Sequence, residues 1–271
     1  MANSKIPRLE RKRYDPVGCC IYCGASEGLS DEHIMPFGLG GNLVLPDASC
    51  RPCAAITGRV EGTVLRGQLR PLRVLRRIQS RSGHGDAPEE IPLRVRRGTE
   101  WETVLLPHDR HPLMVHFPLF APPGCIASDY RGGLHITGLA THNFGADPDA
   151  VLRELAGDEI RATEDQSPAA FARMTAKVAY GLAVAQRGID PTEGRPEVVR
   201  SILGELDEIG RWVGTLAGPD NKLEDVLHLI TLHADGDKGL LIGRVQYFSD
   251  ASTPNYGVVL GELASPFVLV R

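Results

Sequence analysis

Four cysteines are spaced as two pairs that could hold one metal ion. The pairs are Cys20–Cys23 and Cys50–Cys53, and 26 residues separate them. Each pair has the Cys-x-x-Cys spacing that lets two thiolates reach the same tetrahedral ion, so the two pairs together predict a four-cysteine structural zinc site. Cys19 adjoins Cys20 and is the alternative ligand at that position.

The segment between the cysteine pairs contains further groups that could do chemistry. These are the carboxylate of Glu32 and the imidazole of His33. An imidazole can take a proton from water near neutral pH, because its unperturbed pKa is about 6.5. A carboxylate is the hard oxygen ligand that Mg²⁺ or Mn²⁺ prefers, and such an ion can neutralise a leaving oxygen. These residue types suit phosphodiester hydrolysis.

Two short strands are predicted to position these groups. Residues 32–35 favour a strand that Pro36 ends, and the glycines of residues 38–41 favour a flexible loop. Residues 43–45 favour a second strand, which Pro46 ends. Because adjacent residues of a strand point to opposite faces, Glu32 and His33 could share an ion site only at the edge of the strand.

Two helices are predicted to follow the second cysteine pair. Ile56, Val60 and Val64 recur at four-residue spacing, which indicates one helix that Gly67 weakens. A further helix is expected with Pro71 in its first turn, where proline is tolerated. The predicted order is therefore strand, loop, strand, helix.

In this order of elements, residues 17–66 resemble the HNH endonuclease superfamily, the ββα-metal nucleases, in the branch that carries two Cys-x-x-Cys knuckles. The resemblance rests on Glu32-His33-Ile34-Met35-Pro36, followed by Gly40-Gly41 and then Asn42. It implies that His33 is the general base, that Glu32 binds the catalytic Mg²⁺ or Mn²⁺, and that Asn42 orients the histidine ring.

The chain departs from the family pattern directly after the second cysteine pair. The family usually has a histidine or asparagine there as a second ligand of the catalytic ion, whereas this chain has Ala54 and Ala55. Asp47, Thr57 or a histidine from elsewhere are the alternatives for that role.

An arginine-rich segment follows the predicted module. It contains no acid, and guanidinium groups bind phosphates well, so we expect it to contact nucleic acid. Its arginines are Arg66, Arg70, Arg73, Arg76, Arg77 and Arg81. Residues 1–97 carry a net charge of +6 and residues 98–271 a net charge of −10, which indicates different partners for the two parts.

Composition and hydropathy place the chain among ordinary globular proteins. It has 271 residues, of which 42% are hydrophobic and 24% charged. No run approaches the roughly 18 to 20 apolar residues of a membrane span, and residues 1–14 lack the apolar stretch of a secretory signal. We therefore expect a cytoplasmic protein without a membrane partner. Its thiols would stay reduced, with Cys125 as a small buried apolar residue.

The remaining residues predict strands and helices but no recognisable chemistry. Alternating patterns favour a hairpin at 91–105 and strands at 113–117 and 134–138. Helices are expected from Ser167 to Gly188, with Phe171, Met174, Val178 and Leu182 inward, and from Pro196 to Val213. A strand pair is expected at 239–248 and 256–263.

The sequence as a whole predicts an α+β protein in three parts. These are a basic arm at residues 1–16, a zinc-stapled ββα module at 17–81, and an α+β domain of unassigned fold at 88–271. We expect an HNH-type endonuclease that acts on nucleic acid, with DNA favoured over RNA. The alternatives are a zinc-stapled nucleic-acid-binding module without catalysis and a protein-interaction adaptor. The acidic domain could dimerise or bind a protein partner.

Overall fold

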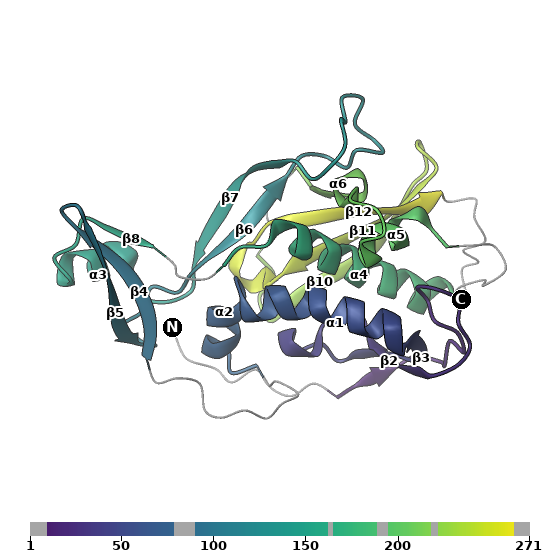
Figure 1. Ribbon diagram of the computed structural model, residues 1–271, viewed down its shortest axis with the longest axis horizontal. Helices are drawn as coiled ribbons and strands as arrows, with labels where there is room; N and C mark the ends of the chain where they lie inside the picture. Colours follow the sequence, from purple (N-terminus) through teal and green to yellow (C-terminus); the bar gives the residue numbers. More distant parts are fainter. Residues whose placement is uncertain (1–9, 79–89, 162–164, 189–194, 218–221, 263–271) are drawn as a thin grey trace.

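Helix α4 (Pro168–Arg187) is the central element of the fold. The computed structural model describes residues 10–78, 90–161, 165–188, 195–217 and 222–262. Thirteen of the twenty residues of α4 are buried, including the predicted inward positions. The helix lies between α1 (Arg51–Arg66) on one side and a four-stranded sheet on the other (Figure 1). It is therefore covered on two opposite faces, whereas the sequence pattern predicted one.

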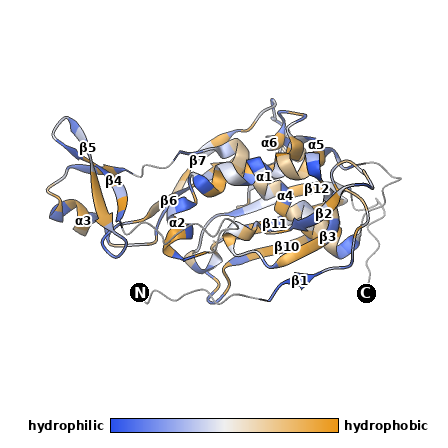
Figure 2. Cartoon of the chain, turned by 60° about the horizontal axis from the view of Figure 1, so that its bottom comes forward, coloured by the Kyte–Doolittle hydropathy of each residue, from blue (hydrophilic) through white to orange (hydrophobic). Residues whose placement is uncertain are grey.

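The N-terminal residues form the predicted ββα arrangement. Strand β3 (Leu43–Cys50) pairs antiparallel with β2 (Leu29–His33) and parallel with β1 (Lys12–Arg13), which is hydrophilic and lies at an edge (Figure 2). A short 3₁₀ turn, η1 (Phe37–Leu39), joins β2 to β3. Helices α1 and α2 (Arg70–Leu75) follow. The order strand, loop, strand, helix is confirmed.

The second strand does not end at Pro46, as the sequence pattern had indicated. Strand β3 continues through Pro46 to Cys50, and a bulge opposite Asp31 absorbs the irregularity. Asp47 takes a positive φ of 48° at this point. Because of the bulge, the strand reaches the second cysteine pair without a break.

The sheet on the far side of α4 is antiparallel and comes from the C-terminal part of the chain. Its order is β10 (His228–Asp235), β11 (Leu240–Tyr247), β12 (Asn255–Glu262) and β9 (Val213–Thr215). The predicted pairing of the two strands near 240–247 and 255–262 is confirmed.

The predicted single helix from Pro196 to Val213 is wrong. Helix α5 (Glu197–Leu203) ends at Gly204, which has a left-handed φ of 78°. A short helix, α6 (Ile209–Trp212), then leads directly into β9. The glycine ends the first helix because it takes this backbone conformation without steric cost.

Part of residues 90–161 forms an outlying sheet with its own small core, whereas Val115, Phe117 and Phe120 pack in the main core. Strands β4 (Glu90–Arg97), β5 (Glu100–Pro107) and β8 (Glu159–Arg161) make one sheet, and α3 (Pro148–Glu154) packs beside it, at the left of Figure 1. Strands β6 (Met114–Phe120) and β7 (Ile136–Asn143) form a separate pair. The β4–β5 hairpin and β6 match the predicted elements, whereas β7 overlaps the strand predicted at 134–138 only at its start and continues to Asn143.

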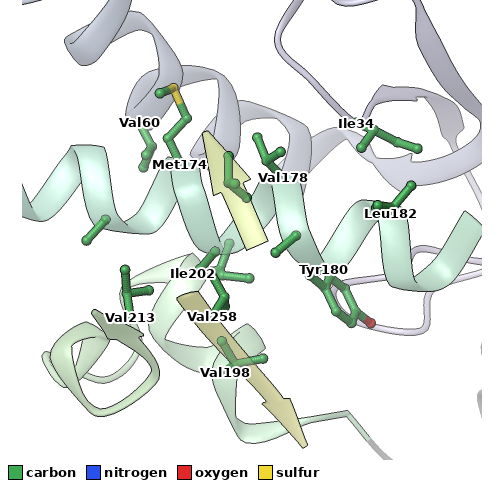
Figure 3. Close-up of a cluster of buried hydrophobic side chains, with 14 of the residues drawn as sticks. Ile34, Val60, Met174, Val178, Tyr180, Leu182, Val198, Ile202, Val213 and Val258 are labelled. Atoms are coloured by element: carbon green, nitrogen blue, oxygen red, sulfur yellow. The ribbon is translucent and has the colours of Figure 1, made fainter. Parts of the chain in front are cut away.

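One hydrophobic core extends across the predicted boundary between module and C-terminal domain. Ile34 and Val60 of the ββα module pack in the same cluster as Val178 of α4 and Val258 of β12 (Figure 3). The segment between the two predicted parts, residues 82–87, lies outside the described residues. Within the described ranges, no helix is long and apolar enough to cross a membrane.

Candidate metal centre

The four predicted zinc ligands meet where the turn at residues 20–24 adjoins β3 and α1. The Sγ atoms of Cys20, Cys23, Cys50 and Cys53 all lie within 4.8 Å of one another. Tetrahedral Zn–S bonds of about 2.3 Å place sulfur atoms about 3.8 Å apart, so the cluster fits one zinc ion. Cys19 is not a member of this cluster.

Local backbone structure brings the two cysteine pairs together. Cys20 and Cys23 lie in a tight turn, in which the Gly24 amide donates a hydrogen bond to the Cys20 carbonyl, 2.8 Å away. Cys50 is the N-cap of α1, and Cys53 lies in its first turn. Amides at a helix N-terminus favour negative charge, which stabilises thiolate ligands there.

The surroundings of Cys53 favour its protonated form when no metal is bound. Burial and the neighbouring Cys20 raise the pKa of the Cys53 thiol well above its ordinary value. The Cys53 thiol therefore resists ionisation by itself, whereas a coordinated zinc ion deprotonates its thiol ligands outright. The cluster is consistent with a structural Zn²⁺. Cys125, predicted to be buried, is exposed and lies elsewhere.

His33 lies at the end of β2, opposite Val44 of β3. Its side chain is largely buried, with 9% of the residue exposed. The imidazole ring contacts the Phe37 ring edge to face, with 5.9 Å between the ring centroids. The Arg11 guanidinium lies over the Phe37 ring. The loop after the strand therefore fixes the imidazole from one side.

Glu32 points into the protein rather than toward solvent. Its carboxylate lies 2.6 Å from Nζ of Lys177, a buried lysine of α4, and the same ammonium lies 2.9 Å from Glu61 of α1. Burial alone would lower the pKa of Lys177, but the two carboxylates raise it above its ordinary value. Burial and the same two carboxylates raise the pKa of nearby Tyr22.

The predicted site for a catalytic Mg²⁺ or Mn²⁺ does not fit this arrangement. A hard divalent ion needs open carboxylate oxygens, and the charge of Glu32 is already balanced by an ammonium group. Ala54 and Ala55 supply no ligand, and the Thr57 hydroxyl donates a hydrogen bond to the Cys53 carbonyl, 3.2 Å away. We therefore assign no reaction step to an ion at Glu32.

Asn42 has a structural hydrogen bond. Its side-chain amide donates to the backbone carbonyl of Glu10 at 2.9 Å. The backbone amide of Lys12 donates in turn to the backbone carbonyl of Asn42. These bonds hold the end of the basic arm along β3. A contact between Asn42 and the His33 ring stays a prediction.

The arginines of the predicted phosphate-binding segment divide into two groups. Arg66, Arg70 and Arg77 are exposed. Arg73 instead donates to the carbonyls of Gly38 and Leu65, and Arg76 pairs with Asp250 at 2.6 Å. Arg81 lies outside the described residues. The exposed surface of α1 adds two arginines that the sequence analysis did not include, Arg51 and Arg59.

Sequence reasoning missed Lys177, Glu61 and Tyr180 as parts of this region. The signal for Lys177 was a charged residue between Ala176 and Val178, in a stretch, residues 174–186, that holds no other charge. Its partners could not be identified, because the contacts join residues more than a hundred positions apart.

No protein-family model, no curated protein sequence and no solved structure matches the chain. The resemblance to HNH nucleases therefore rests on the residues and geometry described above.

Proposed function

We propose that the protein acts on nucleic acid as an HNH-type endonuclease, with DNA favoured over RNA. The observation that carries the proposal is the four-cysteine cluster at the junction of β3 and α1. One zinc ion there would fix β3, which pairs with the strand that ends in His33, against the helix that bears exposed arginines. A base and a phosphate-binding surface would thus belong to one rigid unit.

The charge distribution of α1 and α2 supports binding to phosphates. Five arginines are exposed along this segment, namely Arg51, Arg59, Arg66, Arg70 and Arg77. The single acid of residues 51–78 is Glu61, and it faces inward to Lys177. The outer surface of this segment therefore presents positive side chains, and the segment itself adds no outward carboxylate to compete with phosphate oxygens.

The chemistry of the His33 imidazole supports a hydrolytic role. An imidazole next to bound phosphodiester would take a proton from the attacking water, and arginines would stabilise the charge that develops on the phosphate. The edge-to-face contact between the His33 and Phe37 rings would keep the imidazole oriented.

A second candidate function is nucleic-acid binding without cleavage. The ion pair between Lys177 and Glu32 favours it, because it occupies the carboxylate that the HNH resemblance assigns to the catalytic ion. In that case the zinc-stapled module would serve as a binding unit alone.

A comparison of binding and cleavage tests both candidates. Zinc-loaded protein is mixed with labelled duplex DNA, single-stranded DNA and RNA, with and without added Mg²⁺ or Mn²⁺. We expect His33→Ala to lower the cleavage rate by about 10² to 10⁴ without changing affinity or zinc content. His233→Ala, at an exposed strand position, is the matched control.

The outcomes separate the candidates. A parent protein that binds nucleic acid but cuts none of these substrates supports the binding unit. Cleavage that is unchanged in His33→Ala contradicts the HNH mechanism. Absence of salt-dependent binding to any nucleic acid contradicts both candidates and favours a protein-interaction role.

A further inference from the structure

Lys177 is surrounded by oxygen atoms from two elements of the ββα module. Its Nζ lies 2.6 Å from Glu32 Oε1 of β2 and 2.9 Å from Glu61 Oε1 of α1. It also donates to the backbone carbonyl of His33 and lies 3.4 Å from that of Ile34. The residue is 2% exposed, so water does not replace any of these contacts.

This set of oxygens is the kind that a hard divalent cation takes. Two carboxylates and two backbone carbonyls are typical ligands of Mg²⁺ and Mn²⁺. An ammonium group satisfies the same oxygens through hydrogen bonds and brings one positive charge. We propose that the Lys177 ammonium occupies this carboxylate site as a built-in cation and thereby excludes a divalent ion from Glu32 and Glu61.

The exclusion follows from where Lys177 is attached. A divalent ion bound to both carboxylates would lie within a few ångströms of the ammonium and would be repelled by it. The lysine is anchored in the shared core, where Val178 is fully buried (Figure 3) and so is Ala176. Any other position within the core would bury the ammonium away from these oxygens, which is costly for a charged group.

The inference goes beyond the proposed function and does not depend on it. It concerns only which cation balances Glu32 and Glu61, whether or not nucleic acid is cut. It also makes Lys177 a positioning residue for the module, since the ammonium holds the backbone carbonyl of His33.

The test measures binding of Mn²⁺ alone, without nucleic acid. Zinc-loaded parent, Glu32→Gln, Lys177→Met and the double variant Lys177→Met/Glu32→Gln are titrated, and free Mn²⁺ is followed by electron paramagnetic resonance. Mn²⁺ does not displace zinc from thiolates, because it lies at the weak end of the divalent affinity order. Lys238→Met, an exposed lysine, is the control.

We expect the parent and Glu32→Gln to bind Mn²⁺ equally weakly. Lys177→Met should gain one site at least about tenfold tighter, and the double variant should lose it, because Mn²⁺ needs the carboxylate. Tight Mn²⁺ binding by the parent that Glu32→Gln removes would overturn the inference. A folded Lys177→Met protein without a new site would also overturn it. If Lys177→Met does not fold, the comparison of parent with Glu32→Gln still decides, and none of these readouts involves cleavage.

Discussion

Tyr180 of α4 donates a hydrogen bond from its hydroxyl to the backbone carbonyl of Ile21, 2.7 Å away, inside the first cysteine pair. Both groups are buried. Arg195 reaches the next carbonyl, that of Tyr22, at 2.6 Å. The cysteine cluster is therefore attached directly to the central helix, so the metal centre and the shared core should stabilise each other.

Removing the zinc should destabilise the whole protein rather than the N-terminal residues alone. We expect Cys20→Ser to lower zinc content below one ion per chain and to lower the melting temperature of a single cooperative transition. Cys125→Ser, at an exposed cysteine outside the cluster, should leave both unchanged. Metal analysis and calorimetry measure the two effects. A purified parent with much less than one zinc per chain would contradict the assignment.

Tyr180→Phe should weaken the attachment of the cysteine turn to α4. The change leaves the Ile21 carbonyl buried without this donor, which costs about 1 to 3 kcal/mol of unfolding free energy. Urea denaturation of the zinc-loaded protein measures the loss. Tyr130→Phe removes a similar hydrogen bond, to the Gly133 carbonyl, away from the core and should cost less. Equal losses in the two variants would argue against a special role for Tyr180.

The parts of the structure that the sequence predicted depend on local patterns. Cys-x-x-Cys spacing identified the metal cluster, and proline, glycine and apolar spacing identified the ββα order and helix α4. These signals extend over a few residues, so neighbouring positions in the chain are enough to reveal them.

The contacts that the sequence could not predict join distant residues. Lys177 meets the His33 carbonyl across 144 positions, and Arg76 meets Asp250 across 174. Whether a charged residue faces solvent or a buried partner depends on such packing. For this reason the sequence predicted that Glu32 binds a metal ion, whereas in the structure it pairs with Lys177. Arg73 and Arg76, predicted to contact phosphates, instead have partners within the protein.

Stability should fall in mild acid because of His228. Its Nε2 lies 2.8 Å from the Leu39 carbonyl, and its Nδ1 accepts a hydrogen bond from the Phe248 amide. Burial lowers its pKa to about 4, and nearby Arg76 also disfavours the charged form. Below the ordinary value of about 6.5, the unfolded chain takes up the proton first.

The contribution of His228 should therefore be complete above pH 6.5 and should be lost as the pH falls toward 4. We expect a loss of about 1 to 3 kcal/mol over this interval. Unfolding free energies at several pH values measure it, and His228→Gln should flatten the dependence. A variant whose stability falls as steeply as that of the parent would show that other groups, such as paired carboxylates, cause the loss.

Substitution of exposed and internally bonded arginines should have different effects. Arg70 and Arg77 are exposed, so the double change Arg70→Ala/Arg77→Ala should weaken nucleic-acid binding about equally for all sequences. It should also lower the salt dependence of binding by roughly one unit of slope for each arginine that pairs with a phosphate in the parent complex. Arg73 is half-buried and bonded to the Gly38 carbonyl, 2.6 Å away, so Arg73→Ala should mainly reduce stability.

Fluorescence anisotropy with random duplex DNA at several salt concentrations gives the slopes, and urea denaturation gives the stabilities. Arg110→Ala, in the outlying part of the fold, is the control for removal of an exposed arginine. If the double variant keeps the parent slope, the binding surface lies away from α2, with Arg51, Arg59 and Arg66 of α1 as the next positions to change. If Arg73→Ala lowers the slope without loss of stability, its hydrogen bonds to the loop are exchanged for phosphate on binding.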